Sequence, residues 1–237
     1  MSDLLQVTDL VKIYGRRDAA TRALDGVSLS LAAGEYVGIM GASGSIQVDG
    51  QELTKLRGKE LTRFRRERLG FIFQDCNLLD TLTAFENIAL SLSIVGTPAG
   101  EIKGRVEEMA SLLGISECLQ KYPYQMSGGQ QQRCAAARAM VTRPALVLAD
   151  EPTGALDSKS ARMLLERLEV LNRERGATIL MVTHDAFTAS CCRRVVFLRD
   201  GRIFKELRRG EGEDRRTFFQ TIIRVVTQLG GEMEDVL

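Results

Sequence analysis

Two adjacent carboxylates, Asp150 and Glu151, follow the apolar run Ala145 to Ala149. A short apolar run of this kind is typical of a buried strand, and the carboxyl ends of strands in open α/β sheets face the ligand crevice. There the first carboxylate can hold Mg²⁺, and the second can orient and deprotonate a water for γ-phosphate cleavage. Alone the pair is a weak signal, because a capped strand end explains it nearly as often.

The segment Ser127-Gly128-Gly129-Gln130 stands just before a predicted helix over 131–142. Its S-x-x-Q form is that of a capping box, which needs no ligand. Two glycines and a serine hydroxyl at a helix N-terminus can also close on a phosphate. The spacing favours the phosphate interpretation, because Gln130 precedes Asp150 by 20 residues.

His184, the only histidine, follows a predicted strand over 178–182 and lies 33 residues after Glu151. A lone histidine is usually incidental. Here it is predicted to leave its strand at the same crevice edge as the two carboxylates, where it can donate to a γ-phosphate oxygen.

A phosphate-binding loop is expected after the predicted strand Tyr36 to Met40, but it is short. A P-loop has the form G-x-x-x-x-G-K-[ST] and runs into a helix. Here residues 41–45, Gly-Ala-Ser-Gly-Ser, are followed by Ile-Gln-Val-Asp-Gly, so the lysine and the helix are missing. The candidate phosphate contacts that remain are Gly41, Ser43, Gly44 and Ser45. We interpret the gap as an in-frame deletion between short Ser-Gly-Ser repeats; a subunit that evolved to be silent is the alternative.

Apolar runs predict strands, and amphipathic stretches between the later runs predict helices. The predicted strands are Val27 to Leu31, Tyr36 to Met40, Leu69 to Phe73, Ala145 to Ala149, Thr178 to Val182 and Arg194 to Leu198. Helices are expected at 83–95, 101–113, 130–142, 158–174 and 215–229. The alternation predicts an α/β core with a parallel sheet. We expect the core at 1–73 and 143–209, an inserted helical subdomain at 74–142, and a helical tail at 210–237 that packs back on the core.

Composition excludes few function classes. The 32 basic and 31 acidic residues nearly cancel, so no overall field attracts nucleic acid or a membrane. The basic residues of 57–68 are best explained as a solvated helix face, and we expect no nucleic-acid partner. No apolar run approaches the roughly 18 residues of a membrane span, and the first residues do not resemble a signal peptide. The five cysteines lack C-x-x-C spacing, which favours reduced, mostly buried thiols over a zinc site.

Taken together, these motifs resemble those of the ATP-binding cassette (ABC) subunits of transporters over nearly the whole chain. The resemblance identifies Met126 to Gln130 as the signature loop, and Asp150 and Glu151 as the magnesium aspartate and the catalytic base. It gives further roles to residues that match the family pattern. Tyr14 matches the aromatic that stacks on adenine, and Gln74 matches the glutamine that links the Mg²⁺ site to the helical subdomain. Gly154 to Asp157 match the loop exchanged across the dimer, and His184 matches the switch histidine.

The resemblance implies a P-loop NTPase core with an antiparallel β subdomain, with ATP and Mg²⁺ as cofactors. It also implies a second ATP-binding subunit and a separate membrane permease as partners, and a place at the inner face of the cell membrane. In this family each nucleotide lies between the P-loop of one subunit and the signature loop of the other. Phe71 to Gln74, Asn77 to Asp80 and Gly230-Gly231 resemble the bacitracin-type peptide-resistance branch, near the macrolide and lipoprotein exporters.

The family pattern predicts an ATPase, and the short P-loop predicts that hydrolysis by this chain is impaired. One alternative is a non-catalytic subunit that contributes only its signature loop to a competent partner. A DNA-repair or chromosome ATPase is a second alternative, but it requires a long coiled coil, and no run of several heptads is present. The sequence does not identify the transported substrate, because the permease selects it.

Overall fold

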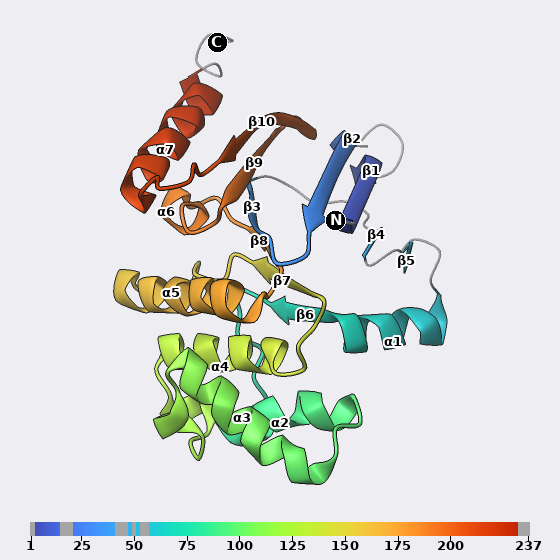
Figure 1. Cartoon of the computed structure of the whole chain (residues 1–237), viewed down its shortest axis with the longest axis vertical. Coiled ribbons are helices and arrows are strands. Elements are labelled where there is room, and N and C mark those ends of the chain that lie inside the picture. Colours follow the sequence, from blue (N-terminus) through green and yellow to red (C-terminus); the bar gives the residue numbers. More distant parts are fainter. Residues whose placement is uncertain (1–2, 15–20, 41–46, 49–50, 53–56, 232–237) are drawn as a thin grey trace. The chain divides into compact units, whose positions relative to one another are not determined.

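The structure is a computed structural model that describes residues 3–14, 21–40, 47–48, 51–52 and 57–231. The chain divides into two compact units (Figure 1). Unit 1 contains Met1–Lys55 and Leu180–Leu237, and unit 2 contains Leu56–Ile179.

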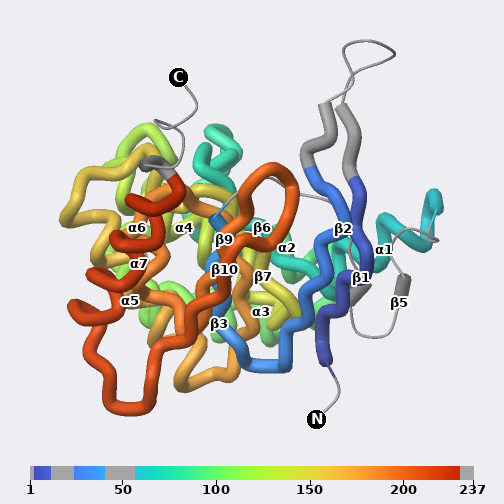
Figure 2. The backbone as a smooth tube through the Cα atoms, turned by 90° about the horizontal axis from the view of Figure 1, so that it is seen from above, coloured from blue at the N-terminus to red at the C-terminus, as the bar shows by residue number. Residues whose placement is uncertain are grey.

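Unit 1 begins with an antiparallel sheet, as predicted. Strands β1 (Asp3–Tyr14) and β2 (Thr21–Ala32) pair with each other, and Figure 2 shows them as a long hairpin. The other edge of β1 pairs with β4 (Gln47–Val48), which pairs with β5 (Gln51–Glu52). Buried leucines of β1 and β2 form the core of the hairpin, and register shifts interrupt its pairing.

A second set of strands in unit 1 carries the parallel pairing. Strand β3 (Tyr36–Met40) pairs in parallel with β9 (Arg194–Arg199), which pairs antiparallel with β10 (Arg202–Arg208). In the strand order β8 (Ile179–Val182) follows β3 on its other side. The short helix α6 (Ala186–Ala189) contacts α7 (Arg215–Gly231), which buries Phe218, Ile222 and Val225. The predicted packing of the tail helix is therefore confirmed.

Unit 2 combines two parallel strands with stacked helices (Figure 1). Helix α1 (Gly58–Arg68) leads into β6 (Leu69–Ile72), which pairs in parallel with β7 (Leu146–Asp150). Between these strands the described chain is helical, as predicted. The elements are α2 (Ala84–Ile94), α3 (Ala99–Leu113), the 3₁₀ turns η2 (Ser116–Cys118) and η3 (Pro123–Gln125), and α4 (Gly128–Met140). Helix α5 (Ser158–Arg175) follows β7.

Helix α4 is the centre of unit 2 and contacts α2, α3 and α5. Its body is rich in alanine, a strong helix former with a small side chain, so neighbouring elements approach it closely. Gly70 of β6 is one such approach, because a Cβ there would collide with the Ala139 carbonyl oxygen. Residues 134–137 are completely or almost completely buried.

Several sequence predictions differ from the structure in detail. Strands β1 and β10 were not predicted, because β1 mixes polar with apolar residues and nearly all of β10 is exposed. Helix α4 begins at Gly128, so its first turn includes both glycines. The limits proposed for the helical subdomain, 74 and 142, stay a prediction.

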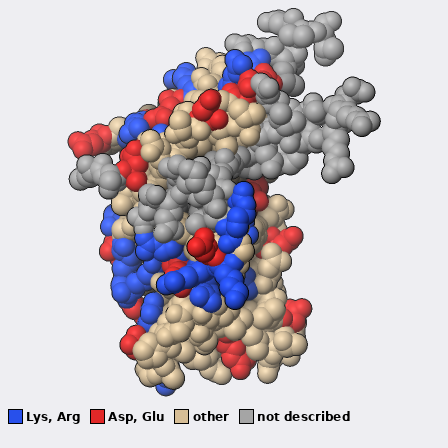
Figure 3. Space-filling model, turned by 90° about the vertical axis from the view of Figure 1, so that its right-hand side faces the viewer, with Lys and Arg blue, Asp and Glu red and all other residues tan. Residues whose placement is uncertain are grey.

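The basic residues of α1 lie on an exposed helix, and Figure 3 shows Lys and Arg gathered on the face that carries it. Glu67 accepts hydrogen bonds from Arg63 and Arg66, and only Phe64 of this helix is buried. This arrangement agrees with a solvated face. In the part of the chain that the structure describes, no helix has the length and apolarity needed to cross a bilayer.

Candidate functional site

The predicted magnesium ligand Asp150 and the predicted catalytic base Glu151 lie at the carboxyl end of β7. Asp150 is exposed as the last residue of the strand, and Glu151 begins the turn that follows. Glu151 has a φ of 42°, a left-handed conformation that is uncommon for a residue with a Cβ. Its carbonyl oxygen accepts from the Gly154 amide at 3.0 Å. The turn therefore holds Glu151 in a strained backbone conformation of the kind that is often found at functional sites.

Gln74 leaves the neighbouring strand at the same edge. Ile72 of β6 pairs with Ala149 of β7 in parallel register, so Gln74 and Asp150 follow their strands at the same edge of the sheet. A carboxylate and an amide oxygen are donors that suit Mg²⁺, which completes its shell with phosphate and water oxygens. Among the described residues no group of three His, Cys, Asp or Glu side chains is placed to hold a metal. The magnesium role of Asp150 and Gln74 stays a prediction.

The signature loop has the predicted capping box. The Ser127 Oγ accepts from the Gln130 amide at 3.3 Å, and the Gln130 Oε1 accepts from the Ser127 amide at 2.9 Å. Gly128 and Gly129 form the first turn of α4, where amide groups lack partners within the helix. The helix N-terminus therefore offers N–H groups and a positive dipole end to an anion.

Gly129 is packed against the start of α5. A Cβ at Gly129 would lie 2.5 Å from the Ser160 Oγ and 2.7 Å from the Ser160 Cβ, so no larger residue fits without movement. The Asp157 carboxylate accepts from the Ser160 Oγ at 2.7 Å and from the amides of Lys159 and Ser160. The hydrogen bond from the Ser160 hydroxyl, followed by that from its amide, lowers the pKa of Asp157. Asp157 thus caps α5 and fixes the side chain on which Gly129 rests.

His184 belongs to unit 1. It is exposed, directly after β8, and the amide of the preceding Thr183 donates to the Ile39 carbonyl of β3 at 3.0 Å. Asp185 then caps α6. The histidine therefore stands near the end of β3, from which residues 41–46 depart.

Five predicted contacts cannot be placed. Gly41, Ser43, Gly44 and Ser45 lie outside the described residues, and so does the side chain of Tyr14, whose backbone ends β1.

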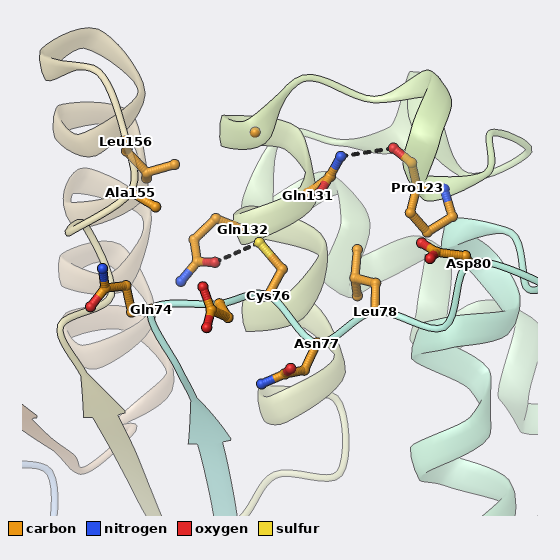
Figure 4. Close-up of a pocket in the computed structure, with 12 residues that line it drawn as sticks. Gln74, Cys76, Asn77, Leu78, Asp80, Pro123, Gln131, Gln132, Ala155 and Leu156 are labelled. Carbon is orange, nitrogen blue, oxygen red and sulfur yellow. Dashed lines mark hydrogen bonds between the residues drawn. The ribbon is translucent and has the colours of Figure 1, made fainter.

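A cavity of about 350 Å³ lies within unit 2, beside the segment that follows Gln74 (Figure 4). It is lined by residues 74–78 and Asp80, by Pro123, by three residues at the start of α4, and by Ala155 and Leu156. The thiol of Cys76 points into the space between this segment and α4, where it donates to the Gln132 Oε1 at 2.8 Å. The cavity thus brings together three motifs that were predicted separately.

Sequence reasoning did not find Ser160, Gln132 or Arg138 as parts of this region. Ser160 lies three residues after Asp157, a spacing that could have indicated its hydroxyl as part of the cap. Gln132 and Arg138 lie six residues apart, and nothing in their local pattern predicts that both reach the segment after Gln74.

The family model described as "ABC transporter" matches residues 42–154. The chain is 45% identical to the bacitracin export ATP-binding protein of Halalkalibacterium halodurans, over 98% of this chain and 99% of the relative. It is 41% identical to the ABC transporter ATP-binding protein YxdL of Bacillus subtilis, over 100% of this chain and 98% of the relative.

A solved structure with a similar fold is the ATP-binding cassette MJ0796, a dimer in a post-hydrolysis state bound to ADP and Pi. The TM-score is 0.75 at 33% identity, and the match covers 86% of this chain and 98% of that chain. The fold is therefore that of an ATP-binding cassette, in agreement with the predicted P-loop NTPase class.

Proposed function

This chain belongs to the ATP-binding proteins of ABC transporters, and we propose that it is the nucleotide-binding subunit of an exporter whose membrane part is a separate permease chain. Members of this family hydrolyse ATP. The observation that carries the proposal is the signature loop, with Ser127 capping α4 and Gly129 resting on Ser160. The names of two relatives, a bacitracin export and a macrolide export protein, support export, and we propose a role in antimicrobial peptide resistance. The chain would act at the inner face of the membrane through its permease.

We propose further that this chain does not hydrolyse ATP at its own P-loop. Only residues 41–46 separate β3 from β4, too few for a P-loop with its helix, and none of them is lysine. The alignment with the Bacillus subtilis relative spans 255 positions against the 237 residues of this chain, a difference of 18. This difference supports a deletion in the present chain.

The missing loop should supply several charge-assisted hydrogen bonds, each worth about 1.5–3 kcal/mol. Without them ATP binds poorly at millimolar concentration. The signature loop of this chain can still serve a nucleotide held by the P-loop of a partner subunit. The function we favour for the present sequence is therefore a half-active member of a mixed dimer.

A mixed dimer with a relative that has an intact P-loop tests this function. The site formed by the P-loop of the partner and the signature loop of this chain should work, and the opposite site should stay empty. Ser127→Arg should then abolish phosphate release, because it blocks the working site. Glu151→Gln should hardly change it, because that carboxylate serves the empty site. The reverse sensitivity would refute the proposal.

Measuring ATP binding by the isolated chain distinguishes a subunit that does not bind ATP at its own P-loop from an ordinary ATPase subunit. We expect no tight Mg-ATP binding by calorimetry. Binding at micromolar concentration would show that residues 41–46 suffice, and the chain would then be an ordinary ATPase subunit.

A further inference from the structure

Helix α4 holds residues 73–77, the segment that contains Gln74, by four hydrogen bonds. The Gln132 Nε2 donates to the Phe73 carbonyl at 2.7 Å, and the Gln132 Oε1 accepts from the Cys76 thiol at 2.8 Å. One turn and a half further along, Arg138 donates from Nη1 to the Asn77 carbonyl at 2.6 Å and from Nη2 to the Cys76 carbonyl at 2.9 Å. Two side chains of one helix thus fix residues 73–77 at both ends.

The environment makes these bonds hard to replace by water. Gln132 is only 1% exposed, and both ends of its amide have a partner. Arg138 is half-buried, and burial lowers the pKa of its guanidinium. A buried polar group that loses its hydrogen-bond partner is not compensated by water. The hydrogen-bonded arrangement of residues 73–77 is therefore strongly preferred over one in which these bonds are broken.

The same helix is tied to the loop after β7 at its N-terminus. Gly129 rests on Ser160, whose hydroxyl is held by Asp157. The other end of this loop touches Gln74, because a Cβ at Gly154 would lie 3.0 Å from the Gln74 Cδ. Gln74, the loop 151–157 and the signature helix therefore form a closed ring of contacts inside unit 2.

We propose that Gln132 and Arg138 are positioning residues that fix Gln74 relative to the signature loop, so that displacement of either one moves the other. The contacts among these residues do not depend on the proposed function. The consequence for ATP hydrolysis rests on the proposed function, which gives Gln74 and the signature loop their roles. Spatial continuity alone does not establish coupling, so the test must measure an effect at one end of the ring after a change at the other.

Amide hydrogen exchange on the full chain measures this coupling directly. Gln132→Met keeps the length of the side chain and removes both hydrogen bonds. We expect amide exchange of residues 74–78 to become about tenfold faster, and the exchange rates of residues 127–131 to change as well. Faster exchange at 74–78 with an unchanged signature loop would overturn the proposal, because the segment would then be anchored without being coupled.

Arg138 provides a graded series with a matched control. Arg138→Met should reproduce the effect of Gln132→Met, and Arg138→Lys, which keeps one donor, should restore part of the protection. The control is Arg105→Met, since Arg105 of α3 also donates to a backbone carbonyl, that of Val141, at 2.9 Å, which lies outside residues 73–77. Equal effects of Arg138→Met and Arg105→Met on the exchange of residues 74–78 would contradict a specific positioning role.

Cys76 allows a second test without mutation. Methyl methanethiosulfonate transfers its S–CH₃ group to the Cys76 thiolate and releases methanesulfinate, and dithiothreitol reverses the step. The mixed disulfide removes the hydrogen that Gln132 accepts. The cysteines at 118, 134, 191 and 192 are buried, so peptide mapping can verify that only Cys76 reacts. In the mixed dimer we expect a several-fold lower kcat with an unchanged KM, because the partner P-loop still binds ATP.

The outcomes separate this inference from the proposed function. A mixed dimer that releases no phosphate before modification refutes the proposed function, and the exchange experiment still decides the coupling. An active mixed dimer whose kcat is unchanged after modification at Cys76 refutes the coupling alone.

Discussion

The two glycine-bearing segments of this chain, residues 41–45 and 127–129, lead into different elements. The second continues into α4, a helix of 13 residues, whereas the first is succeeded by strand β4, which begins at Gln47. Glycines let a backbone approach a phosphate, but the N–H groups that bind it come from the first turn of a helix. A glycine-rich loop is therefore a phosphate site only together with its helix.

The largest expected effect comes from supplying the missing helix. Insertion of the P-loop and helix of the Halalkalibacterium halodurans relative into residues 41–46 should raise phosphate release by about 10³-fold or more. Three charge-assisted hydrogen bonds at about 1.5 kcal/mol each already give this factor. Glu151→Gln in the inserted chain should return the rate to background. If the unmodified chain hydrolyses ATP and Glu151→Gln abolishes that activity, then residues 41–45 bind phosphate without a following helix, which contradicts this comparison.

The same insertion should change the thermal transition. The proposed deletion would remove four or five core side chains, each worth about 1.5–3 kcal/mol against a domain stability of about 5–15 kcal/mol. We expect the unmodified chain to bind a hydrophobic dye and to melt over a broad range, and the inserted chain to melt sharply. Calorimetry checks this. A sharp two-state transition with a normal heat capacity in the unmodified chain would argue against a missing core helix.

The sequence predicted the parts of the fold whose signal is local. Strand β3 was predicted with its observed bounds, because Tyr36 to Met40 is a continuous apolar run between turns. Strand β10 was missed since its side chains are mostly exposed, so its pairing with β9 leaves no hydrophobic pattern. The hydrophobic pattern of a short segment thus indicates whether its side chains are buried. A strand that is held mainly by hydrogen bonds to a neighbouring strand does not show such a pattern.

The candidate site divides in the same way. The capping box at Ser127 was predicted because both partners lie three residues apart. Two other contacts join residues that are far apart in the chain: Gly129 packs against Ser160, and Arg138 donates to the Cys76 carbonyl. Both contacts depend on how α4 packs, so the sequence does not predict them. The catalytic and nucleotide-binding roles of the site residues stay predictions.

The signature loop offers a matched pair of substitutions that tests how closely its glycines are packed. In the chain with the inserted P-loop and helix, Gly129→Ala should lower the free energy of unfolding by about 1–3 kcal/mol, because its Cβ would overlap Ser160. Gly128→Ala should have little effect, since nothing lies within 4 Å of a Cβ there. Denaturant unfolding measures both. Ser160→Gly should rescue much of the loss in the Gly129→Ala background, and equal effects of the two alanines would show that Gly129 is not closely packed.

The smallest expected effect concerns Asp157, which fixes Ser160 below the signature loop. Its pKa is lowered from the ordinary 3.8, first by the hydrogen bond from the Ser160 hydroxyl. A lowered pKa in the folded state means that the charged carboxylate stabilises the fold above the unfolded value, and that this contribution is lost as pH falls through the folded value. In the chain with the inserted P-loop and helix, Asp157→Asn should therefore lower Tm by roughly 2–4 °C at neutral pH.

This difference from the unsubstituted chain should stay constant down to about pH 5 and shrink below 3.8. Thermal melts between about pH 7 and about pH 2.5 measure it. Ser160→Ala removes the principal cause of the shift, so the pKa of Asp157, followed by carboxyl carbon NMR, should rise toward 3.8. A Tm difference that persists unchanged at the acid end of this range would mean that the cap acts through its shape rather than its charge, and that Asp157 holds Ser160 equally well when protonated.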